Sequence, residues 1–246
     1  MKQVVCMKWG DLYGADYVNR LYSMVRRETT GDLRFTCLTD DREGIRAEVE
    51  CHPCPSVDIP PPHNLRGWRK LSLFAPSEEL FGFEGDWLYL DLDVVVTGSL
   101  DDFFGYKSEE PFLVMQNWTQ AGSGIGNTSV QRFRVGNDSY LLEHLLNNQD
   151  EVFQEFTNSQ TYVSRTIKRL EFWPDEWCVL FKVHCVPGWP ARFWKAPTLP
   201  ATARVVAFPG TPNPHQALRG EWPEPKLRKR IYKHIRPAEW IGRYWT

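Results

Sequence analysis

Two aspartates separated by one residue carry the clearest chemical signal in this chain. Asp91 and Asp93 close the stretch Asp-Trp-Leu-Tyr-Leu-Asp-Leu-Asp, which begins at position 86. In an extended segment the side chains alternate, so both carboxylates fall on one side and the leucines on the other. Unpaired carboxylates buried this close together cost several kcal/mol, and a bound divalent cation removes that cost. The spacing therefore predicts a metal site; the alternative is a strand end in solvent.

An α/β arrangement would position these carboxylates. The first expected elements are a strand over residues 4–7, a helix over 17–28 capped by Asp16, and a strand over 34–38. A strand, a helix and a strand within forty residues form a βαβ unit, which implies a parallel sheet. Ligands of open α/β sheets bind beyond the carboxyl ends of the strands. Residues 8–13 and Asp40 lie at such ends.

The rest of the chain continues the same pattern. We expect strands over 45–49, around Asp91 and Asp93, and over 112–116; helices over 68–80, 139–147, 151–156 and 161–169; a helical turn over 100–104; and a glycine-rich loop over 122–126. Beyond Phe172 prolines are frequent, so this part is expected to be rich in loops. We divide the chain into one domain over residues 1–222 and a basic, aromatic C-terminal segment over 223–246.

Composition narrows the class of protein. The 246 residues suit one large domain, and a net charge of −2 gives no reason to expect a nucleic-acid partner. No stretch approaches 18 uninterrupted apolar residues, and the N-terminus lacks a signal-peptide core. The six cysteines are interpreted as free thiols rather than a disulfide framework. These features favour a cytoplasmic protein.

With these residues in view, the chain resembles the GT-A-fold nucleotide-sugar glycosyltransferases, above all the retaining glycogenin and lipopolysaccharide galactosyltransferase family. The resemblance runs from about Val4 to His215. Its most specific parts are Trp-Arg-Lys-Leu at 68–71, Leu-Tyr-Leu-Asp-Leu-Asp at 88–93, and Gly-Ser-Leu at 98–100. It implies one Rossmann-like α/β domain, in which helices flank a mostly parallel central sheet and the C-terminal part is rich in loops.

The resemblance also implies an activity. It predicts a metal-dependent hexosyltransferase that moves a sugar, with retention, from a nucleotide-diphosphate donor, expected to be a UDP-sugar. Asp91-Leu92-Asp93 would hold Mn²⁺ or Mg²⁺ against the diphosphate, and Lys70 would contact the phosphates. Negative charge develops on the leaving phosphate, and a metal ion with fixed cations stabilises it. The acceptor would be a glycan, a lipid-linked saccharide or a protein.

Residues at the edge of the first two strands are further candidates for donor binding. Lys8 could add a cation, Trp9 or Tyr13 could stack on the base, and Asp40 could accept hydrogen bonds from the base or ribose. The plainer alternative is that the lysine is solvated and that the aromatic rings pack beneath the loop.

Three catalytic candidates rest on the resemblance alone. Asn127 and Ser129 lie in Asn-Thr-Ser-Val, which resembles a loop that binds the donor sugar; a simple turn is the alternative. Gln160 matches the centre of an Asp-Gln-Asp-like motif beside the anomeric carbon, but Ser159 and Thr161 replace its carboxylates. That departure argues against a carboxylate nucleophile at these two positions and leaves front-side attack possible.

The last matching stretch is Phe-Pro-Gly-Thr-Pro-Asn-Pro-His at 208–215. Gly210 matches the family, Asn213 stands where the family has a lysine, and His215 is the candidate third metal ligand. The basic, aromatic segment that follows could lie on an anionic membrane or dock as a terminal helix with a solvated face.

Two other functions stay open. A sugar-phosphate nucleotidyltransferase would share the sheet, but it should carry a glycine-rich loop after the first strand, where this chain has Lys8-Trp9-Gly10. A degenerate fold that binds nucleotide sugar or glycan without turnover is compatible with the altered residues Ser159, Thr161 and Asn213.

Overall fold

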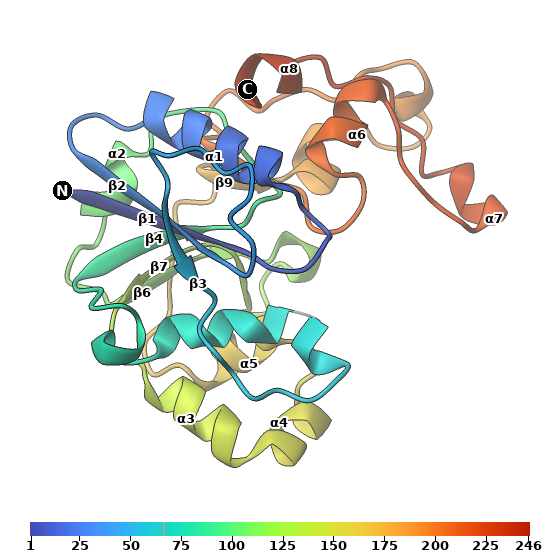
Figure 1. The fold of residues 1–246 in the computed structure, drawn as a ribbon. Coiled ribbons are helices and arrows are strands. Elements are labelled where there is room, and N and C mark those ends of the chain that lie inside the picture. The colour runs from blue at the N-terminus through green and yellow to red at the C-terminus, as the bar shows by residue number, and fades with distance from the viewer. Residues whose placement is uncertain (66) are drawn as a thin grey trace.

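A mostly parallel seven-stranded sheet forms the centre of the computed structural model, which describes residues 1–65 and 67–246 (Figure 1). Its strands run in the order β3-β2-β1-β4-β7-β6-β8, and β7 alone among them is antiparallel to its neighbours. The strands are β1 (Lys2–Lys8), β2 (Leu33–Thr39), β3 (Glu50–Pro53), β4 (Asp86–Leu90), β6 (Phe112–Gln116), β7 (Gly126–Arg134) and β8 (Glu171–Phe172). The predicted α/β class and mostly parallel sheet are confirmed.

A second, three-stranded sheet lies beside the first. It has the order β5-β10-β9, in which β10 is antiparallel to β5 and parallel to β9. Its strands are β5 (Val94–Val96), β9 (Cys178–Leu180) and β10 (Val205–Ala207). Because β5 begins directly after Asp93, this small sheet fixes the backbone that follows the two aspartates in the chain.

Helices cover both faces of the large sheet (Figure 1). The α-helices are α1 (Ala15–Arg27), α2 (Asp101–Gly105), α3 (Tyr140–Asn147), α4 (Gln149–Glu155), α5 (Ser159–Thr166), α6 (Pro214–Arg219), α7 (Leu227–Arg230) and α8 (Ile241–Tyr244). Short 3₁₀ helices are η1 (His63–Leu65), η2 (Gly67–Phe74), η3 (Ser77–Glu79), η4 (Trp118–Gln120) and η6 (Ala191–Phe193), and η5 (Phe181–Cys185) is a π-helical turn. Helix α1 covers one face, whereas η2, α3 and α5 cover the other.

The alternation predicted for the central strand is confirmed up to Leu90, where β4 ends; the expectation that the strand itself carries Asp91 and Asp93 was wrong, because Asp91 follows the strand and Leu92 and Asp93 form a turn before β5. Leu88, Leu90 and Leu92 belong to the core cluster under α1, while Trp87 and Tyr89 belong to the cluster under η2 and α3. All five side chains are buried. The odd-numbered positions therefore face the side on which Asp91 also meets its partners.

Several predicted boundaries were wrong. Residues 45–49, expected as a strand, form none; β3 follows directly at Glu50–Pro53, where it pairs in register with β2. The helix expected over 68–80 is a 3₁₀ helix that ends at Phe74. Asp16 does not cap α1, since Gly14 occupies the N-cap and Asp16 lies in the first turn. The proline-rich part contains β9 and β10, strands of three residues each, too short to show a periodicity.

The stretch Asn-Thr-Ser-Val at 127–130 belongs to strand β7 rather than to a loop. The expected glycine-rich loop ends at Gly126, where the strand begins. A Cβ atom at Gly126 would lie 2.4 Å from Cγ1 of the buried Val114, so only glycine fits beside that side chain. The register of β6 and β7 breaks at this point, because Val114 faces Gln131 while Met115 faces Asn127.

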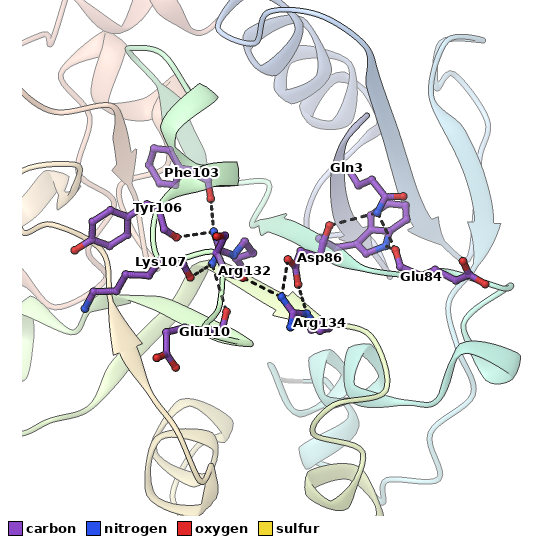
Figure 2. A network of polar contacts seen from close by, with 11 residues as sticks. Gln3, Glu84, Asp86, Phe103, Tyr106, Lys107, Glu110, Arg132 and Arg134 are labelled. Carbon is purple, nitrogen blue, oxygen red and sulfur yellow. Dashed lines mark hydrogen bonds and ion pairs between the residues drawn. The ribbon is translucent and has the colours of Figure 1, made fainter.

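A buried arginine anchors the middle of β7 (Figure 2). The guanidinium of Arg132 donates hydrogen bonds to the carbonyl oxygens of Phe103, Tyr106, Lys107 and Glu110, at 2.6 to 3.4 Å. Burial lowers its pKa. These four carbonyls belong to α2 and the loop that follows it, so one side chain holds that loop against the sheet.

The C-terminal segment divides into a packed part and an exposed part. Ile235, Ala238 and Ile241 are buried in the same cluster as α1, whereas Ile231 and Tyr232 are exposed. Over residues 1–65 and 67–246, no helix is both long and apolar enough to span a bilayer.

Candidate functional site

A cavity of about 690 Å³ opens at the carboxyl ends of β1 and β4. Eight of the nine predicted donor-binding residues line it, together with five others. The lining is Met7, Lys8, Trp9, Gly10, Asp11, Leu12, Tyr13, Gly67, Lys70, Asp91, Leu92, Asp93 and Gly210. The location follows from the topology, because parallel strands end together at one edge of the sheet. The exception is Asp40, whose carboxylate contacts two residues of this lining, Lys8 and Gly10.

Asp91 is held in a network of polar contacts. Its carboxylate is 2.5 and 2.7 Å from the ammonium of Lys70, and it accepts a hydrogen bond of 2.7 Å from the Tyr89 hydroxyl. Its backbone N–H donates to the carbonyl of Ser129. The side chains of Lys70 and Asp91 are 14% and 18% exposed, so this pair is largely shielded from solvent but still reaches the cavity.

Asp93 is more deeply buried, with 8% of its surface exposed. Burial and then the negative charge of Asp91 raise its pKa to about 7, although Lys70 and a hydrogen bond from Tyr13 act in the opposite direction. The Tyr13 hydroxyl donates to Asp93 at 3.1 Å. The folded chain therefore holds an electrostatic conflict between two carboxylates, as the sequence predicted.

A cation at this site would relieve the conflict. Asp91 and Asp93 supply carboxylate oxygens, the donors that Mg²⁺ and Mn²⁺ prefer. Within residues 1–65 and 67–246, no three His, Cys, Asp or Glu side chains are grouped closely enough to form a metal site on their own. Magnesium is commonly held by one or two carboxylates together with substrate phosphates and water, so the two aspartates fit a metal that binds with a diphosphate.

The loop after β1 forms another wall. Lys8 is 6% exposed, and its ammonium donates to the carbonyl of Asp41 at 3.1 Å and lies 4.0 Å from the carboxylate of Asp40. Asp40 also accepts a hydrogen bond from the backbone N–H of Gly10, whose φ of +61° suits glycine. Asp40 thus shapes the loop that carries Trp9 and Tyr13.

His215 does not lie with the two aspartates. It lies on α6 and lines a separate hollow with Tyr17 and Trp245, and its Nδ1 is 2.5 Å from the Tyr17 hydroxyl. Asn213, which precedes α6, is linked to Asp93 instead. Its side-chain oxygen lies 3.4 Å from the Tyr13 hydroxyl, which also contacts Asp93. The third-ligand role of His215 stays a prediction that this geometry does not favour.

The three catalytic candidates lie together at the bulge between β6 and β7. Gln160 on α5 accepts a hydrogen bond of 3.0 Å from the backbone N–H of Thr128, and Asn127 accepts one of 2.9 Å from Ser129. Asn127 and Ser129 are buried. Their strand touches Asp91 through the Ser129 carbonyl, but none of the three lines the cavity.

Sequence reasoning missed Lys182. It belongs to the π-helical turn η5, directly after β9, and its ammonium lies 3.9 Å from where a Cβ of Gly210 would be. A lysine after a short apolar run was the only available signal, and β9 itself was not predicted.

Comparisons with known proteins agree on the fold. No protein-family model matches the sequence, and no curated protein sequence matches it significantly. The galactosyltransferase LgtC, solved with donor and acceptor sugar analogs, has a TM-score of 0.61 and 12% identity, over 99% of this chain and 96% of LgtC. A further LgtC structure is an active-site mutant with glutamate in place of glutamine (TM-score 0.61, 13% identity, 98% of this chain and 99% of that one).

Two other glycosyltransferases are similar. GlyE of Streptococcus pneumoniae has a TM-score of 0.60 and 15% identity, and the match covers 98% of this chain but 63% of GlyE. Mouse xyloside xylosyltransferase 1 has a TM-score of 0.57 and 12% identity, over 86% of this chain and 98% of that one. The chain therefore has the GT-A fold of these glycosyltransferases.

Proposed function

We propose that this chain is a metal-dependent glycosyltransferase that uses a nucleotide-diphosphate sugar, with UDP as the expected nucleotide. One observation carries the proposal. The Asp91–Asp93 pair, Lys70 and the aromatic loop after β1 line one cavity at the carboxyl edge of a GT-A sheet. Carboxylates for a cation, an ammonium for phosphate and rings for a base are the groups that such a donor needs.

The reaction breaks the bond between the anomeric carbon and the diphosphate oxygen. That oxygen keeps the electron pair and gains negative charge, while an acceptor hydroxyl bonds to the carbon and passes its proton to the leaving diphosphate. Asp91 and Asp93 would hold Mn²⁺ or Mg²⁺, which supplies Lewis-acid stabilisation of the leaving diphosphate. Lys70 would turn from Asp91 toward the phosphate, where its fixed positive charge favours departure.

Retention of configuration is part of the proposal. Ser159 and Thr161 provide no carboxylate beside Gln160, so we propose front-side attack rather than a covalent intermediate on these residues. Gln160 is positioned by its bond to Thr128, and in LgtC a glutamine belongs to the active site. Glycans, lipid-linked saccharides and proteins are the candidate acceptors.

A donor screen tests this proposal. Wild-type protein is incubated with a panel of nucleotide sugars, with manganese or with chelator, and release of nucleoside diphosphate is followed alongside binding. We expect metal-dependent binding and slow hydrolysis of one donor, both lost in Asp93→Ala. Binding without turnover, with acceptors from all three classes present, would instead favour the non-catalytic alternative. No binding of any donor would contradict the proposal.

We also propose peripheral contact with an anionic membrane. Its support is four exposed apolar side chains on two segments, Trp189 and Trp194 on one and Ile231 and Tyr232 on the other, which are joined where Arg192 donates to the Tyr232 carbonyl at 2.6 Å. In the sequence, basic residues of the C-terminal segment precede and follow Ile231. Co-sedimentation with vesicles containing phosphatidylglycerol, compared with neutral vesicles, tests it; equal binding to both, or none, would contradict it.

A further inference from the structure

Lys182 stands out among the cations near the cavity. The ammonium groups of the three lysines there have different partners: Lys70 is paired with Asp91, Lys8 lies 4.0 Å from Asp40, and Lys182 donates to the neutral carbonyl of Pro209 at 2.5 Å. Over residues 1–65 and 67–246, Lys182 has no carboxylate within ion-pair distance. A half-buried ammonium without a counter-ion is costly, so an incoming anion would be stabilised there.

The strand register explains why Lys182 reaches this place. Strands β9 and β10 are parallel, with Leu180 opposite Ala207, so the residues after both strands emerge side by side. The chain after β10 is bound to the metal-site loop, because the N–H of Phe208 donates to the carbonyl of Asp93 at 3.0 Å. Gly210 follows and lines the cavity.

Gly210 brings the ammonium close to the cavity wall. It has a φ of +71°, and a Cβ added there would lie 3.9 Å from Nζ of Lys182. Lys182 does not itself line the cavity, but its ammonium lies close to Gly210, which does and which has no side chain to separate the two. The backbone of η5 is also unusual: Val186 donates to Phe181 in the wide turn of a π-helix. Such turns occur frequently at functional sites.

The negative charge of Asp93, one of the two candidate metal ligands, acts on the ammonium of Lys182. Burial, and then the charge of Lys233, lower the pKa of Lys182, while the charge of Asp93 acts in the opposite direction. An ammonium has three N–H donors, and the Pro209 carbonyl uses one of them. Two donors are left for another acceptor.

We propose that Lys182 binds the diphosphate of the donor, from the wall of the cavity formed by Gly210. The assignment rests on the proposed function and makes it more specific. Lys70 and any metal at Asp91 and Asp93 would hold the diphosphate from the β4 side. Lys182 would add a second positive charge from the small sheet, so that the leaving group is held between two sheets.

Calorimetry with uridine, UMP and UDP in the presence of manganese tests this inference. Lys182→Met keeps the unbranched side chain, shorter by one atom, and removes the charge. We expect it to weaken UDP binding about 10- to 100-fold, which corresponds to a hydrogen bond to a charged group. Uridine binding is expected to be unchanged, and Lys182→Arg to restore UDP affinity to within about threefold of the wild type. Lys195→Met, at an exposed lysine that does not line the cavity, is the matched control.

The outcomes distinguish a failure of the Lys182 assignment from a failure of the proposed function. If wild-type protein binds UDP and Lys182→Met binds it equally well, the assignment of Lys182 is wrong and the proposed function stands. If Lys182→Met weakens uridine as much as UDP, or Lys182→Arg restores nothing, the residue is structural and the assignment is again wrong. If the wild type binds no nucleotide, the proposed function fails and this assignment with it.

Discussion

Replacing Asp93 by asparagine should stabilise the protein without metal, even though it should destroy the proposed site. Asparagine has nearly the same shape and can accept the hydrogen bond that Tyr13 donates. What it removes is a negative charge that is buried and faces Asp91. Stabilisation by loss of a charge is a direct test of the electrostatic conflict in this site.

The magnitude follows from proton linkage. The pKa of Asp93 rises from 3.8 to about 7 in the folded chain. Between these values the folded state binds more protons than the unfolded state, so stability falls as pH rises from about 4 to about 7 and is level above that. At about 1.4 kcal/mol per pH unit, the cost at pH 8 is on the order of 2 to 4 kcal/mol. For a chain of this size this corresponds to a rise in Tm of roughly 4 to 16 °C in Asp93→Asn.

Thermal unfolding of both proteins in chelator, from pH 4 to pH 8, measures the effect. The difference in Tm should be close to zero at pH 4, grow through the window and stay constant above pH 7. Asp101→Asn is a contrast of opposite sign, because a hydrogen bond from Lys2 and others from Thr30 lower the pKa of Asp101 to about 2. That variant should lose stability at pH 8, and its deficit should shrink only as pH falls below 4. A pH-independent gain for Asp93→Asn, or a loss, would refute the reasoning.

Three further changes test the packing and the site. Gly126→Ala should lower the free energy of unfolding by about 1 to 3 kcal/mol, because its Cβ would overlap Val114. In a double-mutant cycle followed by urea unfolding, Val114→Ala should recover part of that loss. Arg132→Met should cost about 3 to 5 kcal/mol by removing the buried hydrogen bonds to four carbonyl oxygens; unchanged urea stability would contradict the role drawn in Figure 2. Lys70→Met should weaken UDP binding with manganese about 10- to 100-fold by calorimetry, and equal affinity would remove Lys70 from the donor site.

The parts of the fold that could be predicted are those with a local pattern. The alternation in β4 determined which side Asp91 faces, and the first βαβ unit placed residues 8–13 at the edge where the cavity opens. Both inferences depend only on side-chain periodicity and on the geometry of parallel sheets.

The parts that could not be predicted depend on pairing between distant segments. Strands β9 and β10 have three residues each, and β10 forms because it meets β5, more than a hundred residues earlier. Lys182 was missed for the same reason, since its approach to Gly210 follows from the pairing of β9 with β10. The buried Arg132 likewise finds its partners only in the folded chain.

The conflict at Asp93 also bears on why the chain would keep such a residue. In most of the core the residue types suit their surroundings: apolar side chains are buried, and the buried guanidinium of Arg132 donates to four carbonyl oxygens. Asp93 departs from this, since its carboxylate is buried beside Asp91 and has no ion pair within 4.0 Å among the described residues. Local conflicts of this kind are expected where function, not folding, determines the residue. If metal and nucleotide bind here, their binding free energy adds to the stability of the folded state and offsets the cost. Manganese with UDP should therefore raise the Tm of the wild type and leave that of Asp93→Asn nearly unchanged.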